Sequence, residues 1–174
     1  MPRSSRSPPR CTPAGNGPSD TVSQSSVNVV EVEDPRERSR LCERVLRDLS
    51  EWFGIEEATT AYIRDVAKLP TFAIAEDGFL SLKLHNPSSA EVYVMGVRAT
   101  RHRQGVGSAL LAAAERHLRE RGVEYLQVKT LGPSDPYEPY ASTRRFYESR
   151  GFVPLEELHG LWDDNPCLIM VKRL

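Results

Sequence analysis

The stretch 94–118, which reads VMGVRATRHRQGVGSALLAAAERHL, limits the fold of this chain more than any other. An apolar run predicts a β-strand, a basic turn with two glycines follows, and apolar residues at helical spacing predict a helix. Gly105 and Gly107 stand where the turn becomes the helix, and glycine permits the close backbone approach that a bound phosphate requires. The first turn of a helix carries free N–H groups and a partial positive charge. We therefore expect backbone donors from Gln104 to Ser108 to converge on an anion such as a pyrophosphate.

Two arginines in this turn, Arg101 and Arg103, would attract an anion, and Arg103 could also bind it in a bidentate manner. The turn differs from two common phosphate-binding motifs. No Gly-Lys-Ser/Thr follows it, so it is not a P-loop. Leu110 stands where the dinucleotide fingerprint has its third glycine. Taken alone, the turn is equally compatible with an ordinary helix start whose glycines serve packing, so a second motif must decide.

The size and charge of the chain limit the classes of function. Its 174 residues suit one domain, and 39% hydrophobic and 27% charged residues are ordinary for a soluble globular protein. A formal net charge of -1 argues against overall binding to nucleic acid or membranes, and no apolar run approaches the ~20 residues that span a bilayer. Cys11, Cys42 and Cys167 are scattered and predict neither a disulfide framework nor a zinc site. We expect a cytoplasmic protein without a metal.

Residues 1–26 are rich in Ser, Pro, Gly and Arg and almost lack apolar side chains. Such a segment cannot bury enough surface to offset its ordering entropy, which predicts disorder. Arg3, Arg6 and Arg10 make it basic. A passive leader or an over-long start is favoured over a tail that seeks RNA or membranes, and the folded domain is expected to cover residues 27–174.

The remaining patterns predict a mixed α/β sheet. Asp34, Pro35 and Glu37 have the spacing of a capped helix start, and Asp77-Gly78 is a hairpin-turn signal. The expected strands are 27–32, 71–75, 79–84, 90–97, 123–130, 152–155 and 167–171, and the expected helices are 35–53, 56–69, 106–121 and 141–149. Regular alternation in the strand 90–97 would place Glu91, Tyr93, Met95 and Val97 on one face.

A second motif, Phe-Tyr-Glu-Ser-Arg-Gly-Phe at 146–152, completes a recognisable pattern. A strand, a basic G-x-G turn, a helix, a strand and then F-Y-x-x-x-G-F together resemble the GNAT (Gcn5-related) N-acetyltransferases over residues 27–174. The runs WFGI, EYLQVKTLGPS and NPCLIMVK are similar to one bacterial subgroup of that family. The resemblance implies a mixed, mostly antiparallel twisted sheet flanked by helices, in which the strand before the turn bulges and splays from its neighbour.

The resemblance also implies a site for acetyl-CoA. The turn would cradle its pyrophosphate through Arg103, Gln104, Gly105, Val106, Gly107 and Ser108. The backbone of Met95, Gly96 and Val97 would pair with the pantetheine arm like an added strand. Tyr147 falls where many members place a tyrosine that acts as the acid.

Direct transfer to an amine needs a neutral nucleophile and a proton for the departing thiolate. A lysine-like amine has a pKa near ~10.4 and must lose its proton, whereas a tyrosine, with a pKa near ~10, can donate one. Glu91 occupies the position of a glutamate base in histone-type members, although it could instead lie at an exposed strand end. His85, His117 and His159 are weaker candidates, and His117 is expected on the solvated side of its helix.

Several residues depart from the family pattern or stay open. His102 replaces the usual Arg or Gln, which would weaken one side-chain contact to phosphate. Tyr140 and Thr143 replace the usual Asn and Ala, which puts an asparagine contact to the cofactor in doubt. The hairpin 71–84 looks short. Core packing is favoured over a pocket role for Trp52 and Phe53, and Asp163 and Asp164 would suit a cationic acceptor.

We predict an N-acetyltransferase that moves the acetyl group of acetyl-CoA directly to an amine of a small molecule or peptide. The alternative is a non-catalytic module that binds acyl-CoA as a sensor or scaffold. A nucleic-acid role for the basic tail is opposed by the near-neutral net charge. We expect no nucleic-acid or membrane partner, and because members of the family often dimerise, a homodimer stays open.

Overall fold

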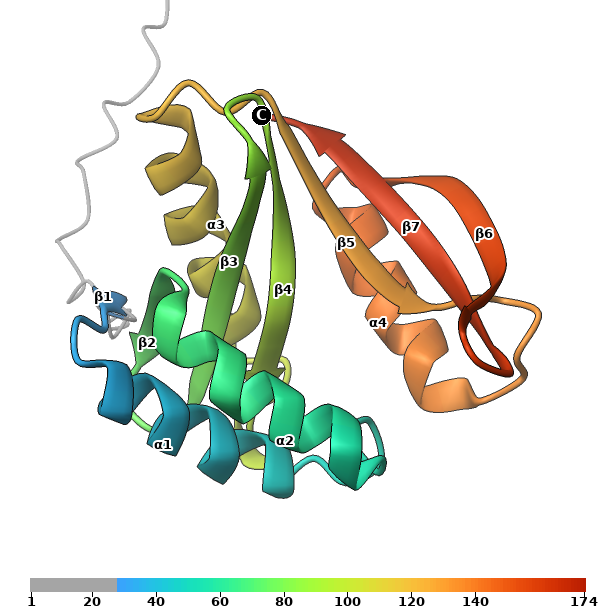
Figure 1. Cartoon of the computed structure of the whole chain (residues 1–174), viewed down its shortest axis with the longest axis horizontal. Coiled ribbons are helices and arrows are strands. Elements are labelled where there is room, and N and C mark those ends of the chain that lie inside the picture. The colour runs from blue at the N-terminus through green and yellow to red at the C-terminus, as the bar shows by residue number, and fades with distance from the viewer. Residues whose placement is uncertain (1–27) are drawn as a thin grey trace, which may run out of the picture.

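A computed structural model describes residues 28–174, so the predicted tail at 1–26 and the start of the first predicted strand lie outside the described residues. Seven strands form one sheet in the order β1-β2-β3-β4-β5-β7-β6 (Figure 1). Neighbouring strands are antiparallel except for the parallel pair β4 and β5. The strands are β1 (Val30–Glu31), β2 (Thr71–Ile74), β3 (Gly78–Asn86), β4 (Ser89–Val97), β5 (Tyr125–Leu131), β6 (Val153–Trp162) and β7 (Asn165–Arg173).

The helices cover both faces of this sheet. Helices α1 (Pro35–Arg47) and α2 (Glu56–Asp65) lie on one face, and α3 (Val106–Arg119) and α4 (Glu138–Ser149) lie on the other (Figure 1). Short 3-10 helices, η1 (Val66–Lys68) and η2 (Ala99–Arg101), follow α2 and β4. The predicted mixed, mostly antiparallel sheet flanked by helices is therefore confirmed. Among residues 28–174, no helix has both the length and the hydrophobicity to cross a bilayer.

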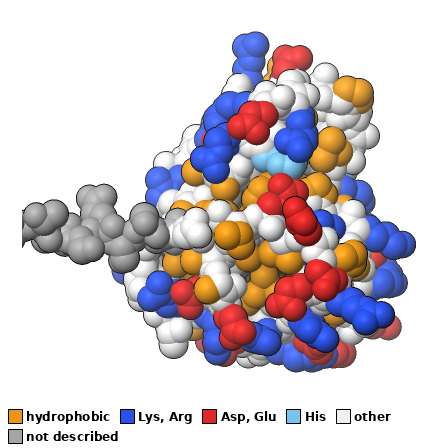
Figure 2. Space-filling model, turned by 90° about the vertical axis from the view of Figure 1, so that its left-hand side faces the viewer, with side chains coloured by type: hydrophobic (Ala, Val, Ile, Leu, Met, Phe, Trp, Pro, Cys, Tyr) orange, Lys and Arg blue, Asp and Glu red, His pale blue; other side chains and the backbone are white. Residues whose placement is uncertain are grey.

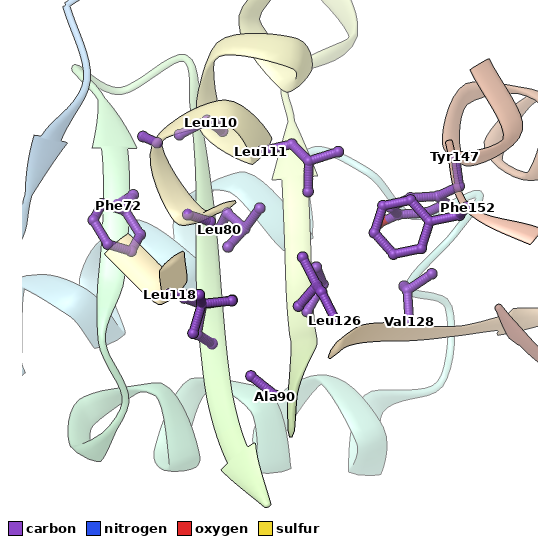
Figure 3. Close-up of a cluster of buried hydrophobic side chains, with 14 of the residues drawn as sticks. Phe72, Leu80, Ala90, Leu110, Leu111, Leu118, Leu126, Val128, Tyr147 and Phe152 are labelled. Atoms are coloured by element: carbon purple, nitrogen blue, oxygen red, sulfur yellow. The ribbon is translucent and has the colours of Figure 1, made fainter. Parts of the chain in front are cut away.

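Two hydrophobic cores lie on opposite faces of the sheet. In the larger core, Leu110, Leu111 and Leu118 of α3 lie against side chains of β2 to β5, and Tyr147 and Phe152 extend the core towards α4 (Figure 3). The smaller core joins α1 to the other face of the sheet, through Leu41, Cys42, Val45, Leu46, Leu49, Phe79 and Val94.

A β-bulge at Tyr93 changes which side chains share a face of β4. Ser81 of β3 pairs with Val94, whereas the next residue, Leu82, pairs with Val92, so Tyr93 is the extra residue. An extra residue inverts the alternation beyond it. The prediction of one shared face is therefore wrong. Glu91 and Tyr93 face the α1 and α2 side, whereas Met95 and Val97 pack against the α3 core.

The parallel strands β4 and β5 separate part of the way along their length. Their pairing covers Ser89–Val92 of β4 and Tyr125–Val128 of β5. Beyond this point β4 pairs with β3 alone and β5 with β7 alone, and the two strands diverge (Figure 1). The last residues of β4 thus present a backbone edge that no described strand pairs with.

Several predicted boundaries are wrong. The first helix ends at Arg47 rather than 53, and hydrogen bonds from the amides of Trp52 and Phe53 to the carbonyl of Leu49 close a turn there. The last helix begins at Glu138 rather than 141 because proline is tolerated in the first helical turn. Strand β6 runs to Trp162 rather than ending at 155. β3 has nine residues, so the hairpin 71–84 is short only in β2.

Candidate active site

The N-terminus of α3 is open to a ligand. Gly105 is its N-cap, with a φ of 82°, and no side chain caps the helix. A Cβ added at Gly105 would meet nothing within 4 Å, whereas one at Gly107 would lie 3.4 Å from the ring of Phe146. Gly105 therefore serves the left-handed backbone conformation, whereas a Cβ at position 107 would make an ordinary van der Waals contact with Phe146 of α4. Arg103 also has a positive φ, of 59°.

The other side chains of this turn stabilise it internally. His102 donates from Nε2 to the carbonyl of Val97 at 2.7 Å, and its ring lies edge-on to Trp52. Gln104 donates from Nε2 to the carbonyl of Thr100 at 2.9 Å. His102 thus ties the turn to the end of β4, which gives it a structural role where the family pattern has Arg or Gln.

Arg150 is a cation at this helix start that the sequence analysis missed. Its guanidinium donates to the hydroxyl of Ser108 at 2.5 Å and lies 5.8 Å from the ring centre of Phe146. The residue follows the end of α4, 42 positions after Ser108, so no local sequence signal joins the two.

Gly96 is required by packing at the unpaired end of β4. A Cβ at Gly96 would lie 2.8 Å from Cγ1 of Val45, because α1 packs directly on this part of the strand. Its neighbours Met95 and Val97 are half-buried against the opposite core. The predicted pantetheine-binding segment is therefore held from both faces, while its backbone edge towards β5 is free of described strand partners.

Tyr147 lies in the larger core with 4% of its surface exposed. Its ring packs edge-on against Phe146 and Phe152, with ring centres 5.2 and 5.3 Å away, and lies near Val128 of β5 (Figure 3). Burial raises the pKa of Tyr147, so its hydroxyl keeps its proton at neutral pH. The phenol therefore stays protonated near Val128, the last residue of β5 that pairs with β4.

Glu91 is buried, with 7% of its side chain exposed, and so does not lie at an exposed strand end. Nζ of Lys129 lies 3.0 and 2.9 Å from its two carboxylate oxygens. Nε2 of His85 donates to one of these oxygens at 2.8 Å and lies 3.1 Å from the side-chain amide of Gln127. Three strands, β3, β4 and β5, thus contribute to one hydrogen-bonded network.

Glu91 and Lys129 of this network line a pocket of about 270 Å³ between α2, β4, β5 and β6. The rings of Tyr62 and Tyr93 meet edge-on with centres 5.4 Å apart, and Tyr93 donates its hydroxyl proton to Asp65 at 2.7 Å. The lining residues are Ala58, Ala61, Tyr62, Glu91, Tyr93, Lys129 and Trp162.

Glu91 and Tyr147 lie on opposite faces of the sheet, both near the end of the β4–β5 pairing. His85 joins Glu91, but the other predicted histidines lie elsewhere. His117 is 8% exposed and packs edge-on against Phe72, so the expectation of a solvated residue is wrong. His159 is largely exposed beside Glu157.

The remaining candidates are structural or exposed. Trp52 and Phe53 pack against the smaller core, in agreement with the favoured interpretation. Asp163 and Asp164 are exposed in the turn between β6 and β7 and do not line the pocket.

On the face shown in Figure 2, acidic and basic side chains intermingle, so this face lacks the single-sign patch that nucleic acid would require.

The family model described as an acetyltransferase (GNAT) domain matches residues 68–154, half of the chain. The match includes β2 to β5, α3 and α4, which together carry the open helix start, the diverging strands and Tyr147. This chain belongs to the GNAT acetyltransferase family. A comparison with curated protein sequences finds no match.

Solved structures share the fold over 84% of this chain. A GNAT-family protein from Desulfovibrio desulfuricans has a TM-score of 0.72 and 20% identity over 98% of its length. An aminoglycoside 6'-N-acetyltransferase complexed with coenzyme A has a TM-score of 0.64 and 17% identity over 96% of its length. The ribosomal-protein-S18-alanine N-acetyltransferase of Escherichia coli has a TM-score of 0.65 and 16% identity over 92% of its length. At these identities the likeness shows the fold.

Proposed function

We propose that this protein transfers the acetyl group of acetyl-CoA directly to an amine of a small molecule or peptide. The observation that carries the proposal is the parting of β4 and β5 beside the uncapped start of α3. An extended thioester arm can pair with the free edge of β4 while its pyrophosphate meets the helix N–H groups. Two of the solved relatives are named for acetylation of an aminoglycoside and of a ribosomal-protein alanine, so both small and peptide acceptors are plausible.

The proposed cofactor site consists of two segments. The backbone of Met95, Gly96 and Val97 would bind the pantetheine arm, and the turn and helix start would bind the pyrophosphate. That second segment comprises Arg103, Gln104, Gly105, Val106, Gly107 and Ser108, with Arg150 beside it. Bound acetyl-CoA supplies the activated acetyl group.

In the proposed reaction, Glu91 and Tyr147 act from opposite faces of the sheet. Glu91 accepts a proton from the acceptor ammonium, for which it must release one of its present partners, Lys129 or His85. His85 is 31% exposed and gives that proton a path to solvent. The neutral amine then attacks the thioester carbonyl, and the C–N bond forms as the C–S bond breaks. Tyr147 donates its hydroxyl proton to the departing thiolate, and the proton that the new amide nitrogen loses restores the phenol. A positioned acid or base contributes roughly 10²–10⁴ in rate.

Gly105 offers a sharp test of the cofactor site. Asp and Asn both tolerate a positive φ and have the same shape, and the space around a Cβ at this position is empty. Gly105→Asp places a negative charge where the pyrophosphate would bind, while Gly105→Asn is the neutral control. Calorimetric titration should show acetyl-CoA binding to the wild type, retention in Gly105→Asn and at least tenfold weaker binding in Gly105→Asp. Equal binding by both variants would remove the pyrophosphate from this turn.

The second candidate function is a non-catalytic module that binds acyl-CoA. It is favoured by the fact that both oxygens of Glu91 already have partners and that Tyr147 is packed among aromatic rings. It predicts acetyl-CoA binding without release of CoA for any amine, whereas the transferase releases CoA only when its acceptor is present.

A cytoplasmic location, expected from the scattered cysteines, stays part of the proposal.

A further inference from the structure

The pocket beside β4 and β5 carries one negative and one positive charge in direct contact. Glu91 is the single carboxylate among its lining residues, and Lys129 is the single ammonium. Their side chains are 7% and 26% exposed, so water covers little of either. Burial and the Glu91 carboxylate raise the pKa of Tyr62, and burial and the Asp65 hydrogen bond raise that of Tyr93, so both phenols are neutral.

This ion pair discriminates between acceptors by their charge. A simple ammonium that takes the carboxylate of Glu91 leaves Lys129 without its counter-ion, and a poorly solvated unpaired charge is strongly unfavourable. A polycation needs several carboxylates, and the pocket lining offers only one that is already paired. A molecule with both an ammonium and a carboxylate replaces each half of the pair, so no charge is left without a partner.

We propose that the acceptor is a small zwitterion, an amine with an anionic group close to it as in a free α-amino acid, and that Lys129 determines this specificity. The inference rests on the proposed acetyl transfer and names the acceptor class at that site. The ammonium binds Glu91 and the carboxylate binds Lys129. A pocket of about 270 Å³ lies below the roughly 300–1,000 Å³ of sites for drug-sized ligands, which fits a molecule of this size.

The walls of the pocket select the rest of the acceptor. Tyr62, Tyr93 and Trp162 contribute aromatic surface from α2, β4 and β6, and the short side chains of Ala58 and Ala61 on α2 leave room beside these rings. Aromatic rings favour contact with an apolar or aromatic side chain. The acceptor's side chain is therefore expected to be apolar rather than charged.

The test compares acceptors that differ only in the anionic group. Phenylalanine and leucine are each supplied as the free acid, the amide and the decarboxylated amine, and CoA release is measured with acetyl-CoA. Spermidine and kanamycin serve as polycations. Because an α-amino amide is the less basic amine and is more readily neutral, a preference for the acid cannot come from amine reactivity. The wild type should favour the acid by roughly ten- to hundredfold in kcat/KM, the range of a hydrogen bond to a charged group.

Variants of Lys129 link this preference to the ion pair. Lys129→Met should abolish the preference for the acid, while Lys129→Arg, which keeps the charge, should retain it. Lys129→Met leaves Glu91 without its cation, so the double variant Glu91→Gln/Lys129→Met is needed to provide a neutral pocket. The acid is titrated into the CoA complex of this double variant and of the wild type. The affinity of the double variant for the acid should be at least tenfold lower than that of the wild type.

Each other outcome identifies which claim fails. If the wild type acetylates the amide, the decarboxylated amine or a polycation as well as the acid, the zwitterion proposal is wrong and acetyl transfer stands. If acetyl-CoA binds but neither amino acid binds the CoA complex at millimolar concentration, the zwitterion proposal is also wrong. If acetyl-CoA itself does not bind, the proposed function fails instead.

Discussion

The hydroxyl of Tyr140 donates a hydrogen bond of 2.6 Å to the backbone carbonyl of Trp52, 88 residues earlier in the chain. Trp52 belongs to the turn after α1, and Tyr140 belongs to α4, which lies beside β5. The bond therefore connects the two halves of the molecule on either side of the gap between β4 and β5. Burial raises the pKa of Tyr140 to about 12, so the phenol remains a donor. This contact gives a structural role to a position at which the family pattern has asparagine.

Removal of this hydroxyl should weaken the connection. We expect Tyr140→Phe to lower the free energy of unfolding by about 1 kcal/mol, the net value of a typical hydrogen bond. Tyr137→Phe is the matched control, because Tyr137 is 43% exposed and precedes the same helix. Urea denaturation of both variants measures the difference. Equal losses in the two variants would mean that the Trp52 contact contributes nothing to stability.

Tyr147→Phe should separate catalysis from folding. Phenylalanine fits between the rings of Phe146 and Phe152, so stability and acetyl-CoA affinity should stay near those of the wild type. The lost proton donor should lower kcat by roughly 10²-fold, the low end for acid catalysis. Steady-state kinetics with the identified acceptor measure this, and an unchanged kcat would remove Tyr147 from the mechanism.

Gly96→Ala should destabilise the contact between α1 and β4. Its Cβ would lie 2.8 Å from Val45, so the helix must shift, and overpacking of this kind costs about 1–3 kcal/mol. Gly107→Ala is the control, because its Cβ has 3.4 Å to Phe146 and alanine favours the helix. Thermal unfolding should show a clearly lower Tm for Gly96→Ala alone. If both variants showed the same change in Tm, the contact between a Cβ at position 96 and Val45 would carry no cost of its own.

The stability of the protein should fall as the pH drops below about 6.5. Burial lowers the pKa of His117 below its ordinary value near 6.5, so the unfolded chain binds the proton first. The contribution of neutral His117 is complete above the unfolded pKa and is lost as the pH falls through the folded pKa. Free energies of unfolding at pH 7 and pH 5 should therefore differ less in His117→Gln than in the wild type.

The exposed His159 supplies the control for that measurement, since it has 71% of its side chain exposed. His159→Gln should keep the wild-type difference between pH 7 and pH 5. The same difference in His117→Gln as in the wild type would assign the acid sensitivity to other groups.

The sequence alone was sufficient to predict features that depend on residues close together in the chain. The strand, turn and helix around Gly105 follow from hydrophobic spacing and from the need for a positive φ at the helix cap. The position of Tyr147 in the last helix, ahead of Gly151, was also predicted. These properties are local because backbone dihedral preferences and side-chain periodicity act over a few residues.

Tertiary structure alone decided the chemistry of the pocket. The bulge at Tyr93 depends on the pairing of β4 with β3, and it reverses the side on which Met95 lies. Glu91 meets Lys129, 38 residues later, only because β4 and β5 pair in one particular register. The burial of His117 likewise depends on β2. Register and packing join segments far apart in the chain, and a periodic pattern within one segment does not specify its partner.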